Sequence, residues 1–431
     1  MSLWSTNELN KLIEDADQLE LFHDLYGDGE DYQLALIRIS ELIDKADYEV
    51  THLFSAPGRT ELGGNHTDHN LGKVFCSAVR NDALAAVAKR SDGKIIVRSE
   101  GFNETFTVEV SGLNVRSSEI GTTNSLIRGV VAGIKESEGE YGGFYAEITS
   151  DVGMGSGLSS SASFEVLIGT ILNHLYNQNK YSPEKIAQIA QHAENKYFGK
   201  PCGLMDQMAS AVGGIMAIDF KDPNNLDIQK IAYDFSAENY VLLVINTGSN
   251  HADLTPAYAS IPSEMGAVAN LLGSDVLRTV QEADFLQNIV SIRSKLGDRS
   301  VLRAMHFYRE NKRVDQMVSA LEAGDFETYL KVVGASGVSS QNILQNSIPP
   351  GSDGQDQGLT YALGVSQLFI EERRRGVARV HGGGFAGSIQ VYIHKDDLDD
   401  YQKLISDTIG ISALQVLSIR HHGSRKILTL P

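Results

Sequence analysis

The sequence predicts a two-domain protein in which helices are combined with antiparallel or mixed β-sheet. Its 431 residues are more than one hydrophobic core usually organises, so two domains are expected. From Val74 to Val110, short apolar stretches separated by turns are typical of such a sheet and differ from regular βαβ units. By contrast, residues 160–175 and 265–335 have the apolar spacing of helices.

Composition limits the classes of function. The net charge of −18 argues against nucleic-acid binding through phosphate contacts, although it leaves room for a nucleotide. Two cysteines, Cys76 and Cys202, are too few for a disulfide scaffold and suit a reducing cytosol. Neither a signal peptide nor a membrane-spanning run is expected. We therefore expect a globular, cytoplasmic protein.

The chain is expected to fall into three parts. Residues 1–50 are predicted to form a helical extension with a packing or capping role. A first domain is expected at 51–235 and a second at 236–431, because the apolar run Tyr240–Asn246 is typical of an opening strand. The apolar residues expected near one face of the extension are Leu34, Ile37, Ile39, Leu42 and Ile43.

A polar, turn-rich segment, Ser55–His69, contains the first candidate functional residues. Arg59 offers a planar set of donors that suits phosphate or carboxylate. Asn65, His66 and Asp68 offer donors and acceptors for hydroxyl groups. The two histidines that flank Asp68 do not match the spacing of zinc ligands. A purely structural loop is the alternative to a binding site.

The glycine-rich stretch Asp151–Ser163 is the strongest functional signal. It follows a strand pattern at Phe144–Ile148 and runs directly into a helix pattern. The first N–H groups of a helix lack partners within it and lie at the positive end of its dipole, so this segment predicts an anion site, above all for phosphate. Its serines add hydroxyls for phosphate oxygens or magnesium. The alternative is a flexible surface turn with a serine N-cap.

Two carboxylates lie within and after a second helix pattern, Pro183–Tyr197. Glu194 belongs to this pattern, and Asp206 follows the tight segment that begins at Gly199. Asp206 could act as a base toward a hydroxyl group, and Glu194 could hold a divalent cation through oxygen. For each of them the alternative is a surface carboxylate on a helix.

The last informative stretch is Arg379–Gly387. Gly382, Gly384 and Gly387 match the dinucleotide pattern G-x-G-x-x-G, but a strand pattern follows where that function requires a helix. A glycine hairpin that lets the backbone approach a substrate fits better, and a merely structural turn is the alternative. A final strand pattern, Ile427–Leu430, is expected to close a sheet.

Together these segments resemble the galactokinase branch of the GHMP kinase family. The chain has neither a P-loop motif nor protein-kinase signatures. Three motifs carry the resemblance, in the family's order: Pro57–Asp68, Gly155–Ala162 and Gly382–Gly387. Gly203–Gln207 resembles the segment that holds the galactokinase acid.

The resemblance implies a fold and an activity. The fold is of the α+β class and has two domains, the first similar to domain 2 of ribosomal protein S5 and the second ferredoxin-like, with the active site in the cleft between them. The activity is phosphoryl transfer from Mg-ATP to the anomeric C1 hydroxyl of galactose, which yields galactose 1-phosphate. ATP and Mg²⁺ are the implied cofactors. The implied partners are small-molecule substrates only, and a monomer is expected.

By matching position, the resemblance also implies roles for single residues. Asp206 would be the catalytic base or charge partner of the sugar hydroxyl, and Arg59 would position that hydroxyl and stabilise the transferring phosphoryl group. The sugar would be bound by Asn65, His66, Asp68, Gly203 and Tyr258. ATP would be bound by Gly153, Gly155, Ser156, Gly157, Leu158, Ser159, Ser160, Ser161 and Ala162. Magnesium would be held by Ser160 or Ser161 together with Glu194.

The chain departs from the family's pattern within the first motif. Asn65 stands where the family has a glutamate that contacts a sugar hydroxyl, and Glu61 stands where the family has an asparagine. Glu61 lies in the same loop and could compensate for the loss of the family's glutamate. The alternatives are therefore a kinase for N-acetylgalactosamine or galacturonate, and a non-catalytic galactose sensor. The intact Ser159–Ala162, Arg59 and Asp206 favour an enzyme.

Overall fold

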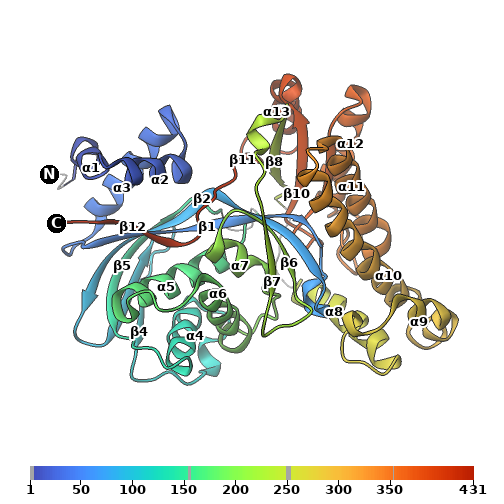
Figure 1. Ribbon diagram of the computed structural model, residues 1–431, viewed down its shortest axis with the longest axis horizontal. Coiled ribbons are helices and arrows are strands. Elements are labelled where there is room, and N and C mark those ends of the chain that lie inside the picture. The colour runs from blue at the N-terminus through green and yellow to red at the C-terminus, as the bar shows by residue number, and fades with distance from the viewer. Residues whose placement is uncertain (1–3, 154–156, 249–253, 353) are drawn as a thin grey trace.

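The computed structural model describes residues 4–153, 157–248, 254–352 and 354–431. Within these ranges, an eight-stranded sheet and a four-stranded sheet lie side by side, and helices cover their faces (Figure 1). No helix in the described part of the chain is long and apolar enough to cross a membrane.

The eight-stranded sheet confirms the predicted antiparallel or mixed pairing. Neighbouring strands pair antiparallel, with the exception of one parallel pair formed by residues 95–99 and 144–148. In spatial order the main path is β12 (Arg425–Thr429), β1 (His52–Gly63), β2 (Lys73–Arg90), β5 (Gly143–Ser150), β3 (Lys94–Ser99) and β4 (Phe106–Glu109). Two further strands extend from β2: β6 (Ile215–Asp219) and β7 (Asp227–Ile231). The expected final strand is β12.

One face of this sheet is covered by helices that share a hydrophobic cluster with it (Figure 1). They are α4 (Thr123–Glu136), α5 (Ser160–Asn177), α6 (Pro183–His192) and α7 (Met205–Val212). Because successive strand residues point to opposite faces, Phe54, Ala85 and Val87 share a hydrophobic cluster with Leu167 and Ile171 of α5. A π-helical segment, Ala193–Phe198, continues α6.

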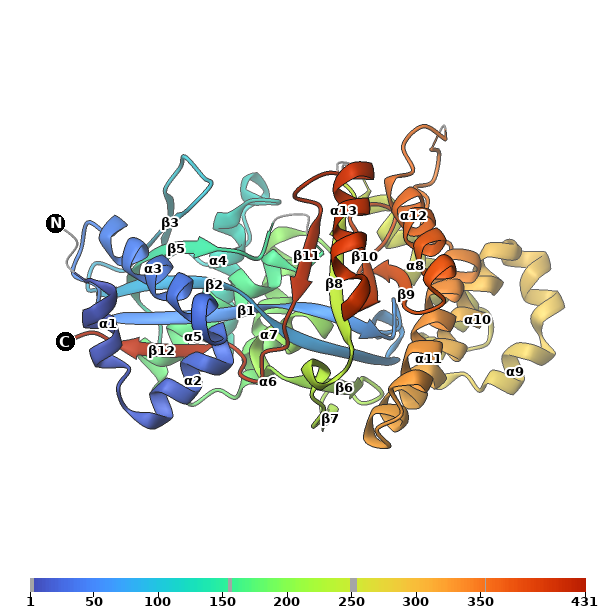
Figure 2. The ribbon, with the colours of Figure 1, turned by 90° about the horizontal axis from the view of Figure 1, so that it is seen from above.

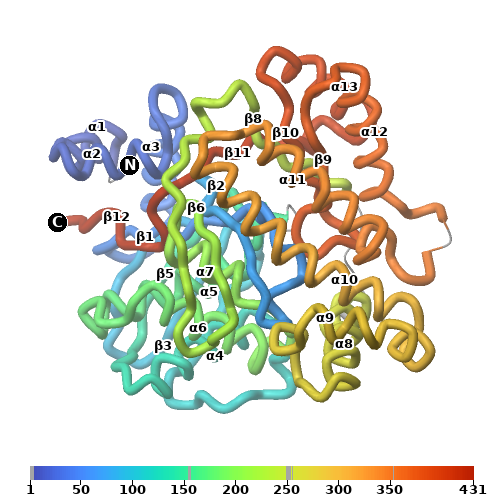
Figure 3. The backbone as a smooth tube through the Cα atoms, turned by 45° about the vertical axis from the view of Figure 1, so that its right-hand side comes forward, coloured from blue at the N-terminus to red at the C-terminus, as the bar shows by residue number. Residues whose placement is uncertain are grey.

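The opposite face is covered by the predicted helical extension, α1 (Thr6–Leu12), α2 (Ala16–Tyr26) and α3 (Gly29–Lys45). A capping box of Ser5 and Glu8 satisfies the first N–H groups of α1. In α3, Ile39 and Leu42 share a hydrophobic cluster with Leu53 of β1. The extension and β12 lie next to each other in every view (Figures 1, 2 and 3).

Two residues of the expected apolar face lie elsewhere. Leu34 and Ile37 are 55% and 45% exposed. The buried stripe of α3 instead runs through Tyr32, Ala35, Leu36, Ile39, Leu42 and Ile43. Because successive helical positions differ by about 100°, Leu34 and Ile37 lie outside the stripe that contacts the sheet.

A buried ionic cluster joins the extension to the sheet. Arg38 of α3 donates to Asp82 Oδ1 at 2.7 Å and to the Thr149 carbonyl at 3.2 Å. The guanidinium of Arg420 lies 3.4 Å from the other Asp82 oxygen. Asp151 accepts from the Asp82 N–H at 2.6 Å. The extension therefore contacts the chain where it enters the glycine-rich loop.

The smaller sheet is antiparallel throughout, in the order β11 (Leu414–Leu417), β8 (Tyr240–Asn246), β10 (Ser388–His394) and β9 (Val377–His381). Between β8 and β9 lie α8 (Thr255–Leu271), α9 (Glu282–Gln287), α10 (Ile289–Glu322), α11 (Phe326–Ser339) and α12 (Gly358–Arg373). Between β10 and β11 lies α13 (Leu398–Thr408). With α8–α12 counted as one connection, this is the βαββαβ order of a ferredoxin-like domain.

Both faces of the smaller sheet are buried. Leu242 and Val244 share a hydrophobic cluster with residues of α10 and α11, whereas Leu243 and Ile245 share one with residues of α12 and α13. Figure 2 shows α10–α12 on the side of the molecule away from the extension. We propose that the second domain begins near residue 236, as expected, and that β12 belongs to the first domain because it pairs with β1.

Candidate active site

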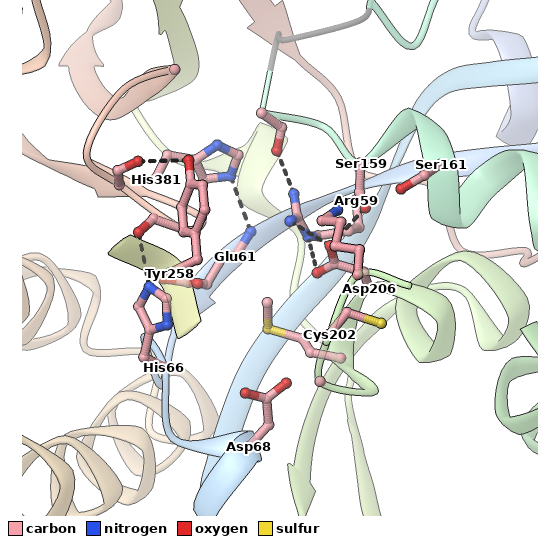
Figure 4. Close-up of a pocket in the computed structure, with 18 of the residues that line it drawn as sticks. Arg59, Glu61, His66, Asp68, Ser159, Ser161, Cys202, Asp206, Tyr258 and His381 are labelled. Carbon is pink, nitrogen blue, oxygen red and sulfur yellow. Dashed lines mark hydrogen bonds and ion pairs between the residues drawn. The ribbon is translucent and has the colours of Figure 1, made fainter. Parts of the chain in front are cut away.

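A cavity of about 660 Å³ lies where the two sheets meet. It is formed by the β1–β2 connection, the glycine-rich loop, the start of α7, α8 and the β9–β10 turn (Figure 4). Most predicted site residues line it: Arg59, Asn65, His66, Asp68, Gly153, Gly157, Ser159, Ser160, Ser161, Glu194, Gly203, Asp206 and Tyr258. Leu158 and Ala162 are buried and do not line the cavity. Gly155 and Ser156 lie outside the described residues.

An ion pair between Arg59 and Asp206 lies at the centre of the site (Figure 4). Arg59 extends from β1, and Asp206 belongs to the first turn of α7. Arg59 donates from Nε to Oδ1 at 2.6 Å and from Nη2 to Oδ2 at 2.8 Å. Burial favours a raised pKa for Asp206, but Arg59 and a hydrogen bond from Ser159 outweigh it and lower the pKa. Asp206 is therefore ionised at neutral pH.

The glycine-rich loop is tied to this pair. Arg59 Nη1 donates to the carbonyl of Gly157, and the Arg59 N–H donates to the carbonyl of Leu158 at 2.9 Å. Gly157 has φ +81°, and a Cβ on it would lie 1.9 Å from Ser388 Oγ. A larger residue would therefore not fit between the loop and β10.

Ser159 does not act as the helix cap that the sequence left open as an alternative. It precedes α5 with φ +65° and makes no side-chain cap bond. Its hydroxyl instead donates to Asp206 Oδ2 at 2.6 Å. The first N–H groups of α5 thus remain directed at the cavity, which is the arrangement expected of an anion site.

The predicted metal-binding residues lie at the same end of the cavity. Glu194 is buried, so it is not the surface carboxylate of the alternative interpretation. Glu194 Oε1 accepts from Ser161 Oγ at 3.1 Å, and Oε2 accepts from Gln207 Nε2 at 2.8 Å. No group of three or more His, Cys, Asp or Glu suited to a metal was found among the described residues. Hydroxyl and carboxylate oxygens nevertheless fit Mg²⁺, which in phosphoryl-transfer sites takes few protein ligands.

His66, Asp68 and Tyr258 lie at the other end of the cavity (Figure 4). His66 Nε2 donates to the carbonyl of Gly383 at 2.8 Å, and Tyr258 Oη donates to that of Gly384 at 3.0 Å. Burial lowers the pKa of His66 to about 3, so this imidazole is neutral. The glycine hairpin predicted at Arg379–Gly387 is confirmed by the pairing of β9 with β10, and its backbone contacts both side chains.

Asn65 differs from its expected role. It is fully buried, and its amide nitrogen donates to both oxygens of Glu61 at 3.1 Å and to the Gly382 carbonyl at 2.7 Å. Its oxygen accepts from Asn346 at 2.9 Å and from Ser340 at 3.3 Å. The amide thus has no unused donor or acceptor for a sugar hydroxyl. We therefore propose that Asn65 supports the cavity wall, where the sequence predicts a sugar contact.

Glu61 belongs to the same buried network. Arg379 donates to Glu61 Oε1, and both side chains are buried. Burial raises the pKa of Glu61 to about 7, against the opposing effect of Arg379. The Glu61 N–H donates to His381 Nε2 at 3.1 Å, so the hydrogen of this imidazole is on Nδ1. Glu61 and Asn65 therefore connect the first motif to β9 and the glycine hairpin.

Arg379, His381 and Gln390 were not predicted as site residues. They lie on β9 and β10, where Gln390 is directly opposite Arg379. Each is buried, and Gln390 donates to the Glu61 carbonyl at 2.8 Å. The available signal was the presence of polar residues within strands that are otherwise apolar.

Folding stability is expected to fall as the pH is lowered from 7 to 5. Burial lowers the pKa of His66, His306 and His381, so the unfolded chain binds protons below about pH 6.5 that the folded chain does not. The lowered pKa values of His52, His174 and His192 act in the same direction. The raised pKa values of Glu61, Asp151 and Glu165 act in the opposite direction. For each additional proton that the unfolded chain binds relative to the folded chain, the free energy of unfolding falls by about 1.4 kcal/mol per pH unit. Urea unfolding at several pH values measures this slope. An unchanged free energy of unfolding from pH 7 to 5 would contradict it.

Comparisons with known proteins agree with this geometry. Residues 125–214 match the model of the GHMP kinases N terminal domain, and residues 43–89 match the galactokinase galactose-binding signature. The chain is 31% identical to the galactokinase of Streptomyces coelicolor, over 84% of this chain and 90% of that protein. It is 33% identical to the galactokinase of Glaesserella parasuis, over 82% and 88%.

Solved structures agree on the fold. A crystal structure of Lactococcus lactis galactokinase complexed with galactose matches with a TM-score of 0.76 and 22% identity, over 91% of this chain and 99% of that one. Methanococcus jannaschii mevalonate kinase matches with a TM-score of 0.60 and 14% identity, over 86% and 98%. These likenesses confirm the expected α+β fold.

Proposed function

The chain belongs to the galactokinases of the GHMP kinase family, and we propose that it transfers the γ-phosphoryl group of ATP to the C1 hydroxyl of galactose. The observation that carries this proposal is the Arg59–Asp206 ion pair. It contacts the glycine-rich loop through Gly157 and Ser159 and shares one cavity with Asp68. A hydroxyl group bound beside Asp206 would therefore lie next to the phosphate site.

Asp206 and Arg59 would act as a unit. The Asp206 side chain is 30% exposed, so it can reach a bound hydroxyl group. Its lowered pKa means that it takes the proton only as the new phosphorus–oxygen bond forms and the hydroxyl becomes more acidic. Arg59 would keep the carboxylate oriented and stabilise the negative charge on the transferring group.

The start of α5 would bind the phosphates. Its N–H groups and the described loop residues from Gly157 to Ser161 would bind phosphate oxygens. Ser160 or Ser161 and Glu194 would hold Mg²⁺, which when bound neutralises charge on the phosphates. The loop would thereby orient ATP toward Asp206.

The sugar would bind at the opposite end of the cavity. Asp68 would accept hydrogen bonds from hydroxyl groups, and neutral His66 and Tyr258 would line the same wall. A galacturonate kinase would need a cation at this end. Among the described residues that line the cavity, Arg59 and Lys200 are the permanent cations, and they contact Asp206 and Glu194 instead. This favours a neutral sugar.

Replacing Gly203 by alanine is expected to raise the KM for the sugar about tenfold, with little change in the KM for ATP. A Cβ at this position would lie 1.6 Å from Asp68 Oδ2, so the carboxylate must move and lose a charge-assisted hydrogen bond to the sugar. Steady-state kinetics with each substrate varied in turn measures both constants. Gly364→Ala is the control, because its added Cβ meets nothing within 4 Å. An unchanged sugar KM would argue against Asp68 as a sugar ligand.

We further propose that the protein acts in the cytoplasm as a monomer on small-molecule substrates. The net charge of −18 and the two free cysteines agree with this setting. Analytical ultracentrifugation of the purified protein would measure the oligomeric state.

The proposed function is tested by ADP release with Mg-ATP and a panel of sugars: galactose, 2-deoxygalactose, N-acetylgalactosamine, galacturonate, glucose and arabinose. Turnover led by galactose is expected. Faster turnover of N-acetylgalactosamine or galacturonate would show that this sugar, and not galactose, is the substrate. Binding of galactose without any turnover would support the non-catalytic sensor and overturn the proposal.

A further inference from the structure

The phosphate end of the cavity has few positive charges to balance a nucleotide. Its carboxylates are Glu194 and Asp206, and the permanent cations among the described residues that line the whole cavity are Arg59 and Lys200. A nucleotide adds further negative charge to this end. Its binding therefore depends on how these two cations are used.

The guanidinium group of Arg59 already has hydrogen-bond partners within the protein. Two of its nitrogens donate to Asp206 and the third donates to the Gly157 carbonyl. Arg59 is also buried, with 6% of its surface exposed. Lys200 differs in both respects, because its side chain is 52% exposed and carries a single flexible ammonium group.

Lys200 occupies the carboxylate proposed to hold the metal. Its Nζ lies 2.9 Å from Glu194 Oε1, which also accepts from Ser161 at 3.1 Å. The other oxygen, Oε2, accepts from Gln207 at 2.8 Å. A cation that binds Glu194 from the cavity therefore competes with the ammonium group of Lys200.

We propose that Lys200 is an exchangeable counter-ion of the nucleotide site. Without nucleotide it neutralises Glu194, and with nucleotide it leaves Glu194 and donates to a phosphate oxygen. This inference rests on the proposed function, because it assumes that the anion at α5 is a nucleotide phosphate. It adds a second cation to the phosphate site, and it makes metal binding at Glu194 dependent on the release of Lys200.

The exchange would leave Glu194 with a cation in both states, because Lys200 neutralises it before the substrate arrives and the metal would neutralise it afterwards. Leaving Glu194 without any cation would expose a buried carboxylate to the full cost of desolvation, which Lys200 prevents before the substrate arrives. An ammonium group on a long, partly exposed side chain can change partners without rearranging the backbone. Ser161 and Gln207 keep the Glu194 carboxylate in place during the exchange, because both donate hydrogen bonds to it.

The test compares Lys200→Met with a matched control in the full-length protein. Lys196→Met removes a lysine that is 51% exposed and pairs with Glu136 at 3.5 Å, outside the cavity lining. Calorimetric titration with ADP in EDTA measures nucleotide binding without metal. We expect Lys200→Met to weaken this binding about tenfold, the usual worth of a charge-assisted hydrogen bond, and Lys196→Met to leave it unchanged. Lys200→Arg should retain most of the affinity.

A second titration, with Mg²⁺ at a fixed ADP concentration, measures the competition at Glu194. Half-saturation should occur at a lower Mg²⁺ concentration in Lys200→Met, because no ammonium group has to leave. Unchanged metal-free ADP binding in Lys200→Met, or an equal loss in Lys196→Met, would overturn the inference while the proposed function stands. A wild-type protein that binds no ADP would overturn the proposed function and the inference with it.

Discussion

Replacing Asp206 by asparagine is expected to lower kcat by about 10²–10⁴-fold while ATP binding stays close to that of the wild type. An amide cannot take the proton of the sugar hydroxyl. It also offers Arg59 one acceptor in place of the two carboxylate oxygens bound at 2.6 and 2.8 Å. The substitution leaves the N–H groups at the start of α5 in the chain, and the remaining amide oxygen can still accept a hydrogen bond from Ser159 or Arg59, so we expect the phosphate site to persist. Turnover assays give kcat, and calorimetry with ADP gives the affinity.

Asp397→Asn is the matched control. Asp397 is buried and pairs with Arg375 through two hydrogen bonds of 2.6 and 2.9 Å, and neither residue lines the cavity. This variant loses the same chemical group from the same kind of ion pair, and its kcat should equal that of the wild type. Full turnover in Asp206→Asn would exclude Asp206 as the base.

Replacing Asn65 by glutamate is expected to destabilise the folded protein by about 3–5 kcal/mol, the cost of an uncompensated buried charge. The new carboxylate would face Glu61, whose oxygens now lie 3.1 Å from the Asn65 amide nitrogen. It would also remove the donor for the Gly382 carbonyl. Denaturant unfolding followed by circular dichroism measures the free energy of unfolding.

Two further variants separate charge from shape at this position. Asn65→Ala removes the same hydrogen bonds without adding charge, so it should be less destabilising than Asn65→Glu. The double variant Glu61→Gln with Asn65→Glu removes the repulsion and should recover part of the lost stability. If Asn65→Glu unfolded like the wild type and changed only the sugar KM, Asn65 would be a sugar contact after all.

Local patterns allowed much of the fold to be predicted. Strand alternation in β5 and the glycine spacing before β10 depend on residues close together in the chain, and both were confirmed. Asp206 was predicted as a site residue because an acid after a tight glycine turn is a local feature of the sequence. Its low pKa was not foreseeable, because it depends on Arg59 of a distant strand.

Features that depend on distant partners were missed or misjudged. Ser159 would cap α5 on local grounds, yet its hydroxyl binds Asp206. Asn65 was expected to face the sugar, but residues from Ser340 to Gly382 surround its amide. The burial of Arg379 depends on how β9 meets β1. The polar residues within β9 are a signal of buried partners, but they do not identify Glu61 and Leu62 as those partners.

The position of β12 has a consequence for how the chain folds during synthesis. Strand β1 (residues 52–63) leaves the ribosome long before its neighbour β12 (residues 425–429). Ile427 and Leu428 of β12 complete the cluster against which the extension packs. For on the order of tens of seconds of translation between these strands, the nascent chain therefore exposes the unpaired edge of β1 and the part of this apolar cluster that β12 covers. We expect chaperones that bind such surfaces to retain the nascent chain until β12 has emerged.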